Sequence, residues 1–307
     1  MANRISELTA SIRRCLPAFS VRENEPLAKH TSFRIGGPAR LMVFPQNAEE
    51  LAEVLRSATN CGVTPWILGA GTNLLAPDEG IDGLVICLKD TFMGLRLLDA
   101  TTVEAMSGMS LAQTAMFAAR NRLSGMEALH GIPGSVGGGV FMNAGAYGTE
   151  LKDVAVRTEF MHPNGETQWF EGDVQGFAYR TSVFQQMPGV IVRTQFSLQG
   201  GDEAEIRKKI RELNDRRRAS QPLEKPSAGS VFRRPEGHFA GALIEQAGLK
   251  GLRIGDAQVS EKHAGFIVNL GHATAREVLE LIASVQEKVY AHSGVRLEPE
   301  VRLWGQK

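Results

Sequence analysis

The most informative part of this chain reads Gly131-Ile-Pro-Gly-Ser-Val-Gly-Gly-Gly-Val-Phe-Met-Asn-Ala-Gly-Ala-Tyr-Gly148, with seven glycines in eighteen residues. Glycine has no Cβ, so such a stretch adopts backbone conformations closed to other residues and lies flat against a ligand. Its amides then form a row of hydrogen-bond donors for an anion such as a diphosphate. This stretch therefore indicates a backbone cradle for a ligand.

A second glycine turn, Gly69-Ala-Gly-Thr-Asn-Leu74, follows the apolar run 66–68. Neither turn fits the two common phosphate motifs. Val140 and Phe141 follow Gly139 where a P-loop requires lysine. Leu74 stands where a Rossmann fingerprint requires its third glycine. Two unrelated cradles in one chain indicate a large cofactor that carries a diphosphate.

The composition is that of a soluble protein with about two domains. The chain has 307 residues, of which 43% are hydrophobic, and its 34 Lys and Arg balance 34 Asp and Glu. This neutrality argues against a partner such as nucleic acid or a membrane surface. No apolar run is long enough to span a bilayer, and no signal-peptide core is visible. The three cysteines form no metal-type pair. We expect a cytoplasmic monomer without a metal.

Hydrophobic periodicity predicts a mixed α and β chain. Helices are expected at 2–16, from 47 to Gly62, and at 111–122, 203–218 and 275–292, the last with a capping box of Thr274 and Glu277. Strands are expected at 41–44, 65–68, 83–88, 102–106, 153–161, 166–170 and 189–193, and Asn164-Gly165 predicts a hairpin turn. Residues 21–38 are expected to be irregular. A change in composition near residue 200 predicts a helical segment 1–29, a domain 30–200 and a domain 201–307.

Several motifs occur in one order that is not generic: Thr31…Ile35-Gly-Gly, Gly69-Ala-Gly-Thr-Asn, Gly131-Ile-Pro-Gly-Ser…Asn143-Ala-Gly-Ala-Tyr-Gly, Tyr179-Arg-x-Ser182, Gln221-Pro…Ala228-Gly-Ser-Val-Phe and Pro299-Glu-Val-Arg302. Over about residues 30–305 this order resembles the UDP-N-acetylenolpyruvoylglucosamine reductase family. Only a short segment separates Arg180 from the strand at Gly189, so the chain resembles the family's second type, which lacks a tyrosine-bearing insertion.

The resemblance implies an α+β chain with an FAD-binding fold of the vanillyl-alcohol-oxidase (PCMH) class and a C-terminal α+β substrate domain, whose final strand returns to the active site. FAD is expected to be bound non-covalently, since Thr72 and Asn73 occupy the turn where related oxidases often attach the flavin through histidine. The residues matched to FAD binding are Gly69, Ala70, Gly71, Thr72, Asn73, Leu74, Gly131, Pro133, Gly134, Ser135, Gly137, Gly138, Asn143 and Gly145.

The resemblance also implies the chemistry. NADPH reduces the FAD and leaves, and the flavin then delivers hydride to an enolpyruvyl sugar nucleotide. Arg180 matches the arginine that pairs with the substrate carboxylate, Glu300 matches a glutamate beside it, and Ser230 matches the proton donor to the carbanionic carbon. The residues matched to the substrate, or neighbouring such positions, are Tyr179, Arg217, Gln221, Arg234, Lys262 and His263. Arg234 departs from the asparagine that the first type tends to have.

Two alternatives stay open at this level. An oxidase of the same fold acting on an alcohol or lactone would explain both glycine cradles, but not the set of Arg180, Ser230 and Glu300. A regulator that binds a sugar nucleotide without catalysis would need no flavin. Taken alone, each of the polar motifs quoted above is typical of an exposed protein surface. The basic run 216–218 is likewise typical of the C-terminal end of a helix.

Overall fold

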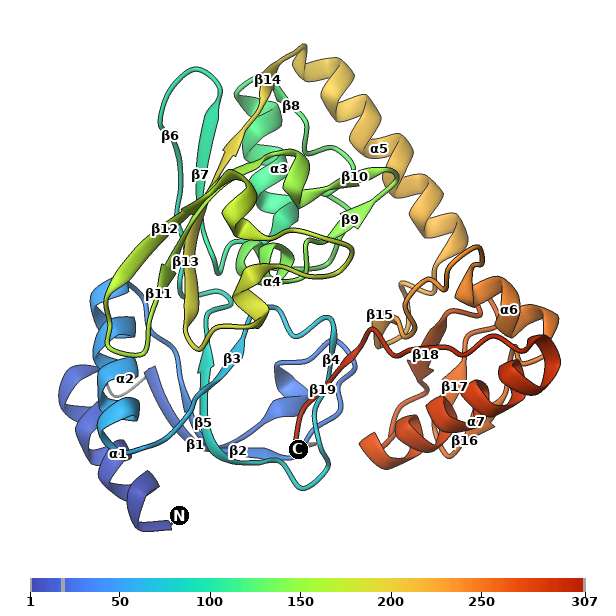
Figure 1. Cartoon of the computed structure of the whole chain (residues 1–307), viewed down its shortest axis with the longest axis horizontal. Helices are drawn as coiled ribbons and strands as arrows, with labels where there is room; N and C mark the ends of the chain where they lie inside the picture. Colours follow the sequence, from blue (N-terminus) through green and yellow to red (C-terminus); the bar gives the residue numbers. More distant parts are fainter. Residues whose placement is uncertain (1, 18–19, 306–307) are drawn as a thin grey trace. The chain divides into compact units, whose positions relative to one another are not determined.

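The computed structural model describes residues 2–17 and 20–305 (Figure 1). Its contacts divide the chain into two compact units. The first consists of residues 1–24, 40–70 and 82–215, and the second of residues 25–39, 71–81 and 216–307. This division differs from the linear domains expected from composition, because two short segments from the first third of the chain belong to the second unit.

The first unit holds one core between two helices and a sheet of order β1-β2-β5-β3. Its elements are α1 (Ala2–Cys15), β1 (Val21–Pro26), β2 (Pro38–Val43), α2 (Ala48–Asn60), β3 (Trp66–Leu68) and β5 (Ile81–Cys87). The Asn47 side chain caps α2 by accepting from the Glu50 amide at 2.9 Å. Leu51, Val54 and Leu55 then recur at helical spacing and are buried in this core. The α1 stripe of Ile5, Leu8 and Ile12 is buried in the same core, so the expected N-terminal helical segment does not stand apart.

A second core of the first unit lies on a five-stranded sheet of order β12-β11-β13-β7-β6 (Figure 1). The strands are β6 (Leu95–Leu97), β7 (Thr102–Met106), β11 (Ala155–Met161), β12 (Thr167–Glu171) and β13 (Val190–Ser197). The remaining elements are α3 (Leu111–Arg120), β8 (Leu123–Ser124), α4 (Val136–Phe141), β9 (Gly145–Ala146), β10 (Thr149–Glu150), β14 (Gln199–Gly200) and α5 (Glu203–Ser220), whose last turn belongs to the second unit. Gly165, with a φ of +82°, turns the predicted hairpin between β11 and β12.

The second unit is a sheet of order β15-β18-β17-β16 that shares a core with two helices. Its elements are β4 (Leu74–Leu75), β15 (Ser227–Ser230), α6 (Ala240–Gln246), β16 (Arg253–Ile254), β17 (Ala257–Val259), β18 (Phe266–Asn269), α7 (Ala275–Ser293) and β19 (Arg302–Leu303). The predicted capping box of Thr274 and Glu277 begins α7, and Gly294 ends it with a φ of +71°. The Asp78 carboxylate also accepts from the first α7 amides, Ala275 at 2.7 Å and Arg276 at 3.1 Å.

The predicted helices and strands are confirmed to within a few residues of their ends, but β6, β16 and β17 were not predicted and other regions differ as well. Residues 21–38, expected to be irregular, contain β1. The second glycine stretch, expected to lie flat, contains α4, and α6 was not predicted. In the part of the chain that the structure describes, every helix is too short or too polar to traverse a bilayer.

Leu281→Ala tests the core of the second unit. Leu281 in α7 is fully buried in this core, so truncation leaves a cavity. We expect the free energy of unfolding to fall by about 2–5 kcal/mol, measured by urea denaturation. Glu287→Ala, at an exposed position of the same helix, is expected to change it by less than about 0.5 kcal/mol. Equal effects of the two variants would contradict the assignment of this core.

Candidate active site

The first glycine turn passes so close to a neighbouring loop that position 71 requires glycine. Gly71 has a φ of +64°, and a Cβ built on it would lie 2.1 Å from the carbonyl oxygen of His30. The Ser32 amide and hydroxyl both donate to the Gly71 carbonyl, at 3.0 and 3.3 Å. Within the described part of the second unit, the amides of residues 71–73 have no protein acceptor. They are therefore donors available to an anionic ligand.

The last strand of the chain brings Glu300 to this turn. β19 pairs in parallel with β4, and the Arg302 amide donates to the Asn73 carbonyl at 3.1 Å. The Asn73 side chain donates to the Glu300 carbonyl at 3.3 Å, across 227 positions of sequence. Asn73 thus ties the first glycine turn to the main chain of Glu300.

Ser230 reaches the same place from β15. The Glu300 amide donates at 2.7 Å to the carbonyl of Val231, the residue after Ser230. An isolated antiparallel bridge between Phe232 and Pro299 continues this pairing. Ser230 is exposed and Glu300 is half-buried. The structure therefore brings two of the three predicted catalytic residues together beside the first glycine turn.

Two arginines that the sequence analysis did not assign to the site, Arg233 and Arg302, lie in this region together with Glu298 and Glu300. The Arg233 amide donates to the Glu298 carbonyl at 2.8 Å, and Arg302 lies two residues after Glu300. Burial, together with the nearby charge of Arg233, lowers the pKa of the Arg302 guanidinium from its ordinary value. Two like charges held near each other favour a bound anion. Nothing in the spacing of these arginines along the chain indicates their proximity.

Backbone amides of the second glycine stretch donate to carbonyl groups of the protein, which corrects the expectation that these amides form a free row of donors. Its amides at Gly134, Val136 and Gly137 donate to the carbonyls of Ile132, Met109 and Ser107, at 2.8, 2.7 and 2.9 Å. The Gly138 amide donates to the Ser135 hydroxyl at 3.3 Å. The available amides found above therefore belong to the first turn.

Close approach explains the glycines at these positions. A Cβ on Gly69 would lie 2.4 Å from the Ser135 hydroxyl, and one on Gly137 would lie 2.8 Å from the Ser107 Cβ. A Cβ on Gly145 would lie 2.7 Å from the Thr149 carbonyl oxygen. The glycines thus let backbone and small side chains meet in the first unit. Gly131 is half-buried and Pro133 is exposed in the turn that precedes it.

Arg180 stands at the tip of a tight turn in a strained conformation. Ala178 and Thr181 exchange both backbone hydrogen bonds, at 3.1 and 3.2 Å, which leaves Tyr179 and Arg180 as the two turn residues. Arg180 has a φ of +56°, a left-handed conformation that costs a non-glycine residue on the order of 1 kcal/mol. Its guanidinium lies 5.1 Å from the centre of the Tyr179 ring. Such a conformation persists where the surroundings impose it.

Three side chains impose the conformation of this turn. The Gln185 side-chain amide donates to the Arg180 carbonyl at 3.0 Å and to the Phe141 carbonyl at 2.8 Å. The Ser182 hydroxyl also donates to the Phe141 carbonyl, at 2.8 Å. The Asn143 amide donates to the Ala178 carbonyl at 3.0 Å. The Arg180 turn is therefore fastened to the end of α4.

Asn143 acts within the protein and was interpreted differently from the sequence. Its side chain is fully buried, and it also donates to Glu150 at 3.1 Å and accepts from the Lys152 amide at 3.0 Å. These bonds occupy both ends of the carboxamide. Asn143 thus positions the Arg180 turn, whereas it was expected to contact FAD. Gln185 was missed entirely, because a lone glutamine carries no spacing signal.

Residues matched to the substrate meet at the end of α5. The Lys262 ammonium donates to the Arg218 carbonyl at 2.5 Å, and the Gln221 amide donates to the Arg217 carbonyl at 2.9 Å. Arg217, Gln221 and Lys262 therefore belong to one basic region of the second unit.

Arg234 and His263 have partners of their own. The Arg234 guanidinium lies 4.0 Å from the centre of the Phe239 ring and donates to the His238 carbonyl at 3.3 Å. The His263 Nδ1 accepts from the Gly265 amide at 3.2 Å, which assigns the proton of the neutral ring to Nε2. Burial lowers the pKa of His263 from its ordinary value, so this ring is neutral at pH 7 and offers one N–H donor.

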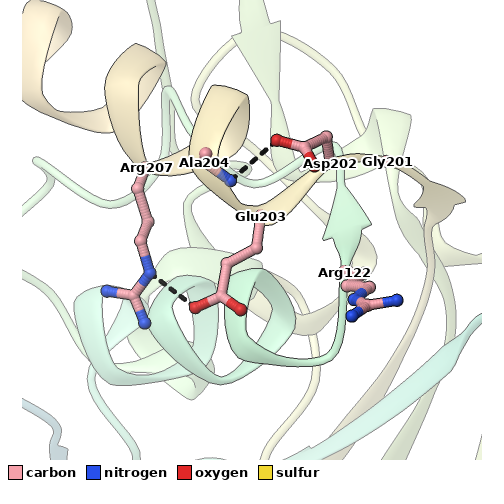
Figure 2. A pocket seen from close by; sticks show the side chains of 6 residues that line it. All are labelled: Arg122, Gly201, Asp202, Glu203, Ala204 and Arg207. Carbon is pink, nitrogen blue, oxygen red and sulfur yellow. Dashed lines mark hydrogen bonds and ion pairs between the residues drawn. The ribbon is translucent and has the colours of Figure 1, made fainter.

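A pocket of about 600 Å³ at the start of α5 contains none of these residues (Figure 2). It is lined by Arg122, Gly201, Asp202, Glu203, Ala204 and Arg207. Three of its four charged residues are paired: Arg207 pairs with Glu203 at 2.7 Å, and Asp202 accepts from the Ala204 amide at 2.9 Å. We therefore assign no ligand to this pocket.

Comparisons with known proteins agree with the predicted family. Residues 39–171 match the model of the FAD binding domain, and residues 221–304 match that of the UDP-N-acetylenolpyruvoylglucosamine reductase C-terminal domain. The chain is 47% identical over 288 residues to UDP-N-acetylenolpyruvoylglucosamine reductase of Latilactobacillus sakei, covering 94% of each chain. It is 45% identical over 293 residues to that of Streptococcus uberis, covering 95% of this chain and 96% of the relative.

Solved structures show the same relationship. The reductase of Thermus caldophilus superimposes with a TM-score of 0.79 at 38% identity, covering 92% of this chain and 99% of that one. An alkyldihydroxyacetonephosphate synthase, at 15% identity and a TM-score of 0.50, is alike in fold over 63% of this chain and 40% of its own. The predicted FAD-binding fold of the vanillyl-alcohol-oxidase class is confirmed. The chain is a flavoprotein that belongs to the UDP-N-acetylenolpyruvoylglucosamine reductase family.

Proposed function

We propose that this protein reduces UDP-N-acetylglucosamine enolpyruvate to UDP-N-acetylmuramate, with NADPH as the reductant, in the synthesis of peptidoglycan precursors. One observation carries the proposal. The Glu300 amide is bonded to Val231 and the Glu300 carbonyl is bonded to Asn73, at 2.7 and 3.3 Å. The main chain that carries Glu300 is thereby fixed both to the strand end that carries Ser230 and to the first glycine turn, within the second unit. The names of the family's relatives supply the substrate class.

The residues present fit a bound FAD. The amides of residues 71–73 offer donors to its diphosphate. Hydride-transfer chemistry, from NADPH to the methylene carbon of the enolpyruvyl group, is what FAD supplies when it is bound. The protein supplies binding, orientation and a proton.

Three side chains act on the enolpyruvyl group. Hydride addition to the methylene carbon moves an electron pair onto the neighbouring carbon and its carboxylate. Arg180 pairs with that carboxylate and stabilises the developing charge. Glu300 lies against the same group. Ser230 donates its proton to the neighbouring carbon, which completes the saturation of the double bond, and its exposed hydroxyl regains a proton from solvent.

The substrate diphosphate is assigned to the basic region at the end of α5. Arg217 and Lys262 provide the positive charge, while Tyr179, Gln221, Arg234 and His263 complete the contacts of the sugar nucleotide. FAD is held by the residues around both glycine stretches, including Gly69, Ala70, Leu74, Gly134 and Ser135. We also propose that the protein acts as a monomer in the cytoplasm, a state that light scattering of the purified protein checks against its 33.3 kDa.

Anaerobic reduction tests the proposed function. Wild-type protein is expected to be yellow, to lose its flavin absorbance with NADPH, and to regain it when the enolpyruvyl nucleotide is added. Ser230→Ala is expected to keep the first step and slow the second by about 10²–10⁴-fold, because the proton donor is lost. Ser220→Ala, whose hydroxyl bonds to its own helix at 3.0 Å, is the matched control.

Several outcomes contradict this proposal. Normal turnover of the Ser230 variant would remove that residue from the mechanism. Rapid reoxidation of the wild-type flavin by oxygen, without any response to the nucleotide, would favour an oxidase. A colourless protein that still binds the UDP-sugar would favour a regulator.

Gln185→Ala tests how the Arg180 turn is held. Without the bond to the Arg180 carbonyl, the strained turn relaxes and the guanidinium loses its position. We expect kcat with the nucleotide to fall about 10-fold, a loss equivalent to about 1.4 kcal/mol, while flavin reduction by NADPH is unchanged. Gln186→Ala, at the exposed neighbouring position, should have no effect. An equal loss in both half-reactions would show general damage instead.

Arg217→Ala combined with Lys262→Ala tests the diphosphate site. Loss of two cations that bind the ground state and the transition state alike raises KM with little change in kcat. We expect KM for the nucleotide to rise at least about 10-fold, given the strength of charge-assisted bonds, in steady-state kinetics. Lys288→Ala, exposed on α7, is the control. An unchanged KM in the double variant refutes this assignment.

A further inference from the structure

Strand β15 contains one residue more than its partner strand just before Ser230. Ser227 pairs with Val268 of β18, and Ser230 pairs with Phe266. Three steps along β15 therefore oppose two steps along β18, which is the pattern of a β-bulge. Gly229, with a φ of +77°, lies inside this bulge, directly before the proposed proton donor.

The bulge decides which side chains of this segment are buried. Successive side chains of a regular strand point to opposite faces, so residues an odd number of positions apart lie on different faces. Ala228 and Val231 are three positions apart, yet both are buried in the core of the second unit, at 3% and 0% exposure. Ser230, two positions after Ala228, is exposed. Without the extra residue, Ser230 would share the buried face of Ala228 and Val231 would be exposed.

Hydrogen bonds fix the chain on both sides of the bulge. Before it, the Ser32 hydroxyl donates to the Ser227 carbonyl at 2.6 Å. After it, the Val231 amide donates to the Gly265 carbonyl at 2.9 Å. The extra residue is therefore confined to 228–230, because a shift of the bulge along the strand would break one of these bonds.

The backbone conformation, and not crowding, requires glycine at position 229. L side chains rarely adopt a φ near +77°, whereas glycine adopts it freely. A Cβ built on Gly229 has no described atom of the protein within 4 Å. A substitution at this position therefore acts through the backbone: it favours loss of the bulge without adding a clash with the protein.

We infer that Gly229 is a positioning residue, whose bulge keeps the Ser230 hydroxyl on the exposed face of β15. The inference rests on the proposed function, which makes Ser230 the proton donor, and adds the backbone element that presents this hydroxyl. Loss of the bulge would turn the hydroxyl toward the core of the second unit, where it reaches no substrate. A glycine with a structural role alone would affect stability and leave the proton transfer unchanged.

Two substitutions at position 229 separate a backbone effect from obstruction by a side chain. Asparagine adopts positive φ more readily than alanine, although its side chain is larger. For Gly229→Ala we expect reoxidation of the reduced flavin by the enolpyruvyl nucleotide to slow about 10-fold, equivalent to about 1.4 kcal/mol, with reduction by NADPH unchanged. Gly229→Asn is expected to be faster than Gly229→Ala in the same step.

Gly248→Ala is the matched control for strain. Gly248 follows the C-cap of α6 and has a φ of +71°, and a Cβ built on it also has no described atom within 4 Å. This variant carries a similar backbone strain in the same unit, away from β15. We expect a Tm lowered as in Gly229→Ala, with both half-reactions at the wild-type rate.

Alkylation at position 230 tests the exposure of this side chain without using activity. Ser230→Cys is treated with iodoacetamide as purified, and the labelled peptide is identified by mass. We expect labelling to be about 10-fold slower when Gly229→Ala is also present, because the same shift in population buries the thiol. Cys87 is buried and serves as the internal reference for an intact fold, so it should stay unlabelled in both proteins.

The remaining outcomes overturn the inference or the proposed function, and they are distinguishable. Normal reoxidation in Gly229→Ala, equal slowing of both half-reactions, or equal labelling in the two backgrounds overturns the inference. A slower rate in Gly229→Asn than in Gly229→Ala also overturns it, since the side chain itself would then be the obstacle. If the nucleotide does not reoxidise the wild-type flavin, the proposed function fails, while the labelling result still reports on the bulge.

Discussion

The parallel pairing of two short strands, Leu74–Leu75 and Arg302–Leu303, is the constraint on which the candidate site depends. It joins the end of the chain to the first glycine turn and so places Glu300 beside that turn. The Asn73 side chain and the Val231 carbonyl then hold the main chain of Glu300 from two directions. Without this pairing, Ser230, Glu300 and the donors of the turn would belong to unrelated loops.

Arg180 illustrates a second constraint, the local strain that a positioned guanidinium requires. A positive φ at an arginine is unfavourable in isolation, and the surrounding bonds from Gln185, Ser182 and Asn143 impose it. The three side chains donate to the backbone carbonyls of Arg180, Phe141 and Ala178. Strained backbone conformations that the surrounding structure imposes are common at functional sites.

The sequence predicted what depends on local pattern and missed what depends on long-range contacts. Helical periodicity and caps identified α2 and α7 with little error, since Asn47 and Thr274 act on residues three positions away. The glycine stretch concealed α4, because glycine disfavours helices and the bonds to Ser107 and Met109 that hold it come from distant residues. The same limit explains the domain boundaries: pairing between residues 74 and 302 is invisible along the chain, yet it places residues 71–81 in the second unit. For the site, motif order led to the proposal of Arg180, Ser230 and Glu300, while Gln185 required coordinates.

The central claim is that Arg180, Ser230 and Glu300 act on one substrate group beside a bound flavin. A crystal structure with FAD and the enolpyruvyl nucleotide tests it most directly. The account predicts that the guanidinium of Arg180, the hydroxyl of Ser230 and the carboxyl group of Glu300 all lie within hydrogen-bonding distance, about 3 Å, of the enolpyruvyl group. A complex in which any of the three faces away from that group, with the nucleotide bound elsewhere, would contradict it.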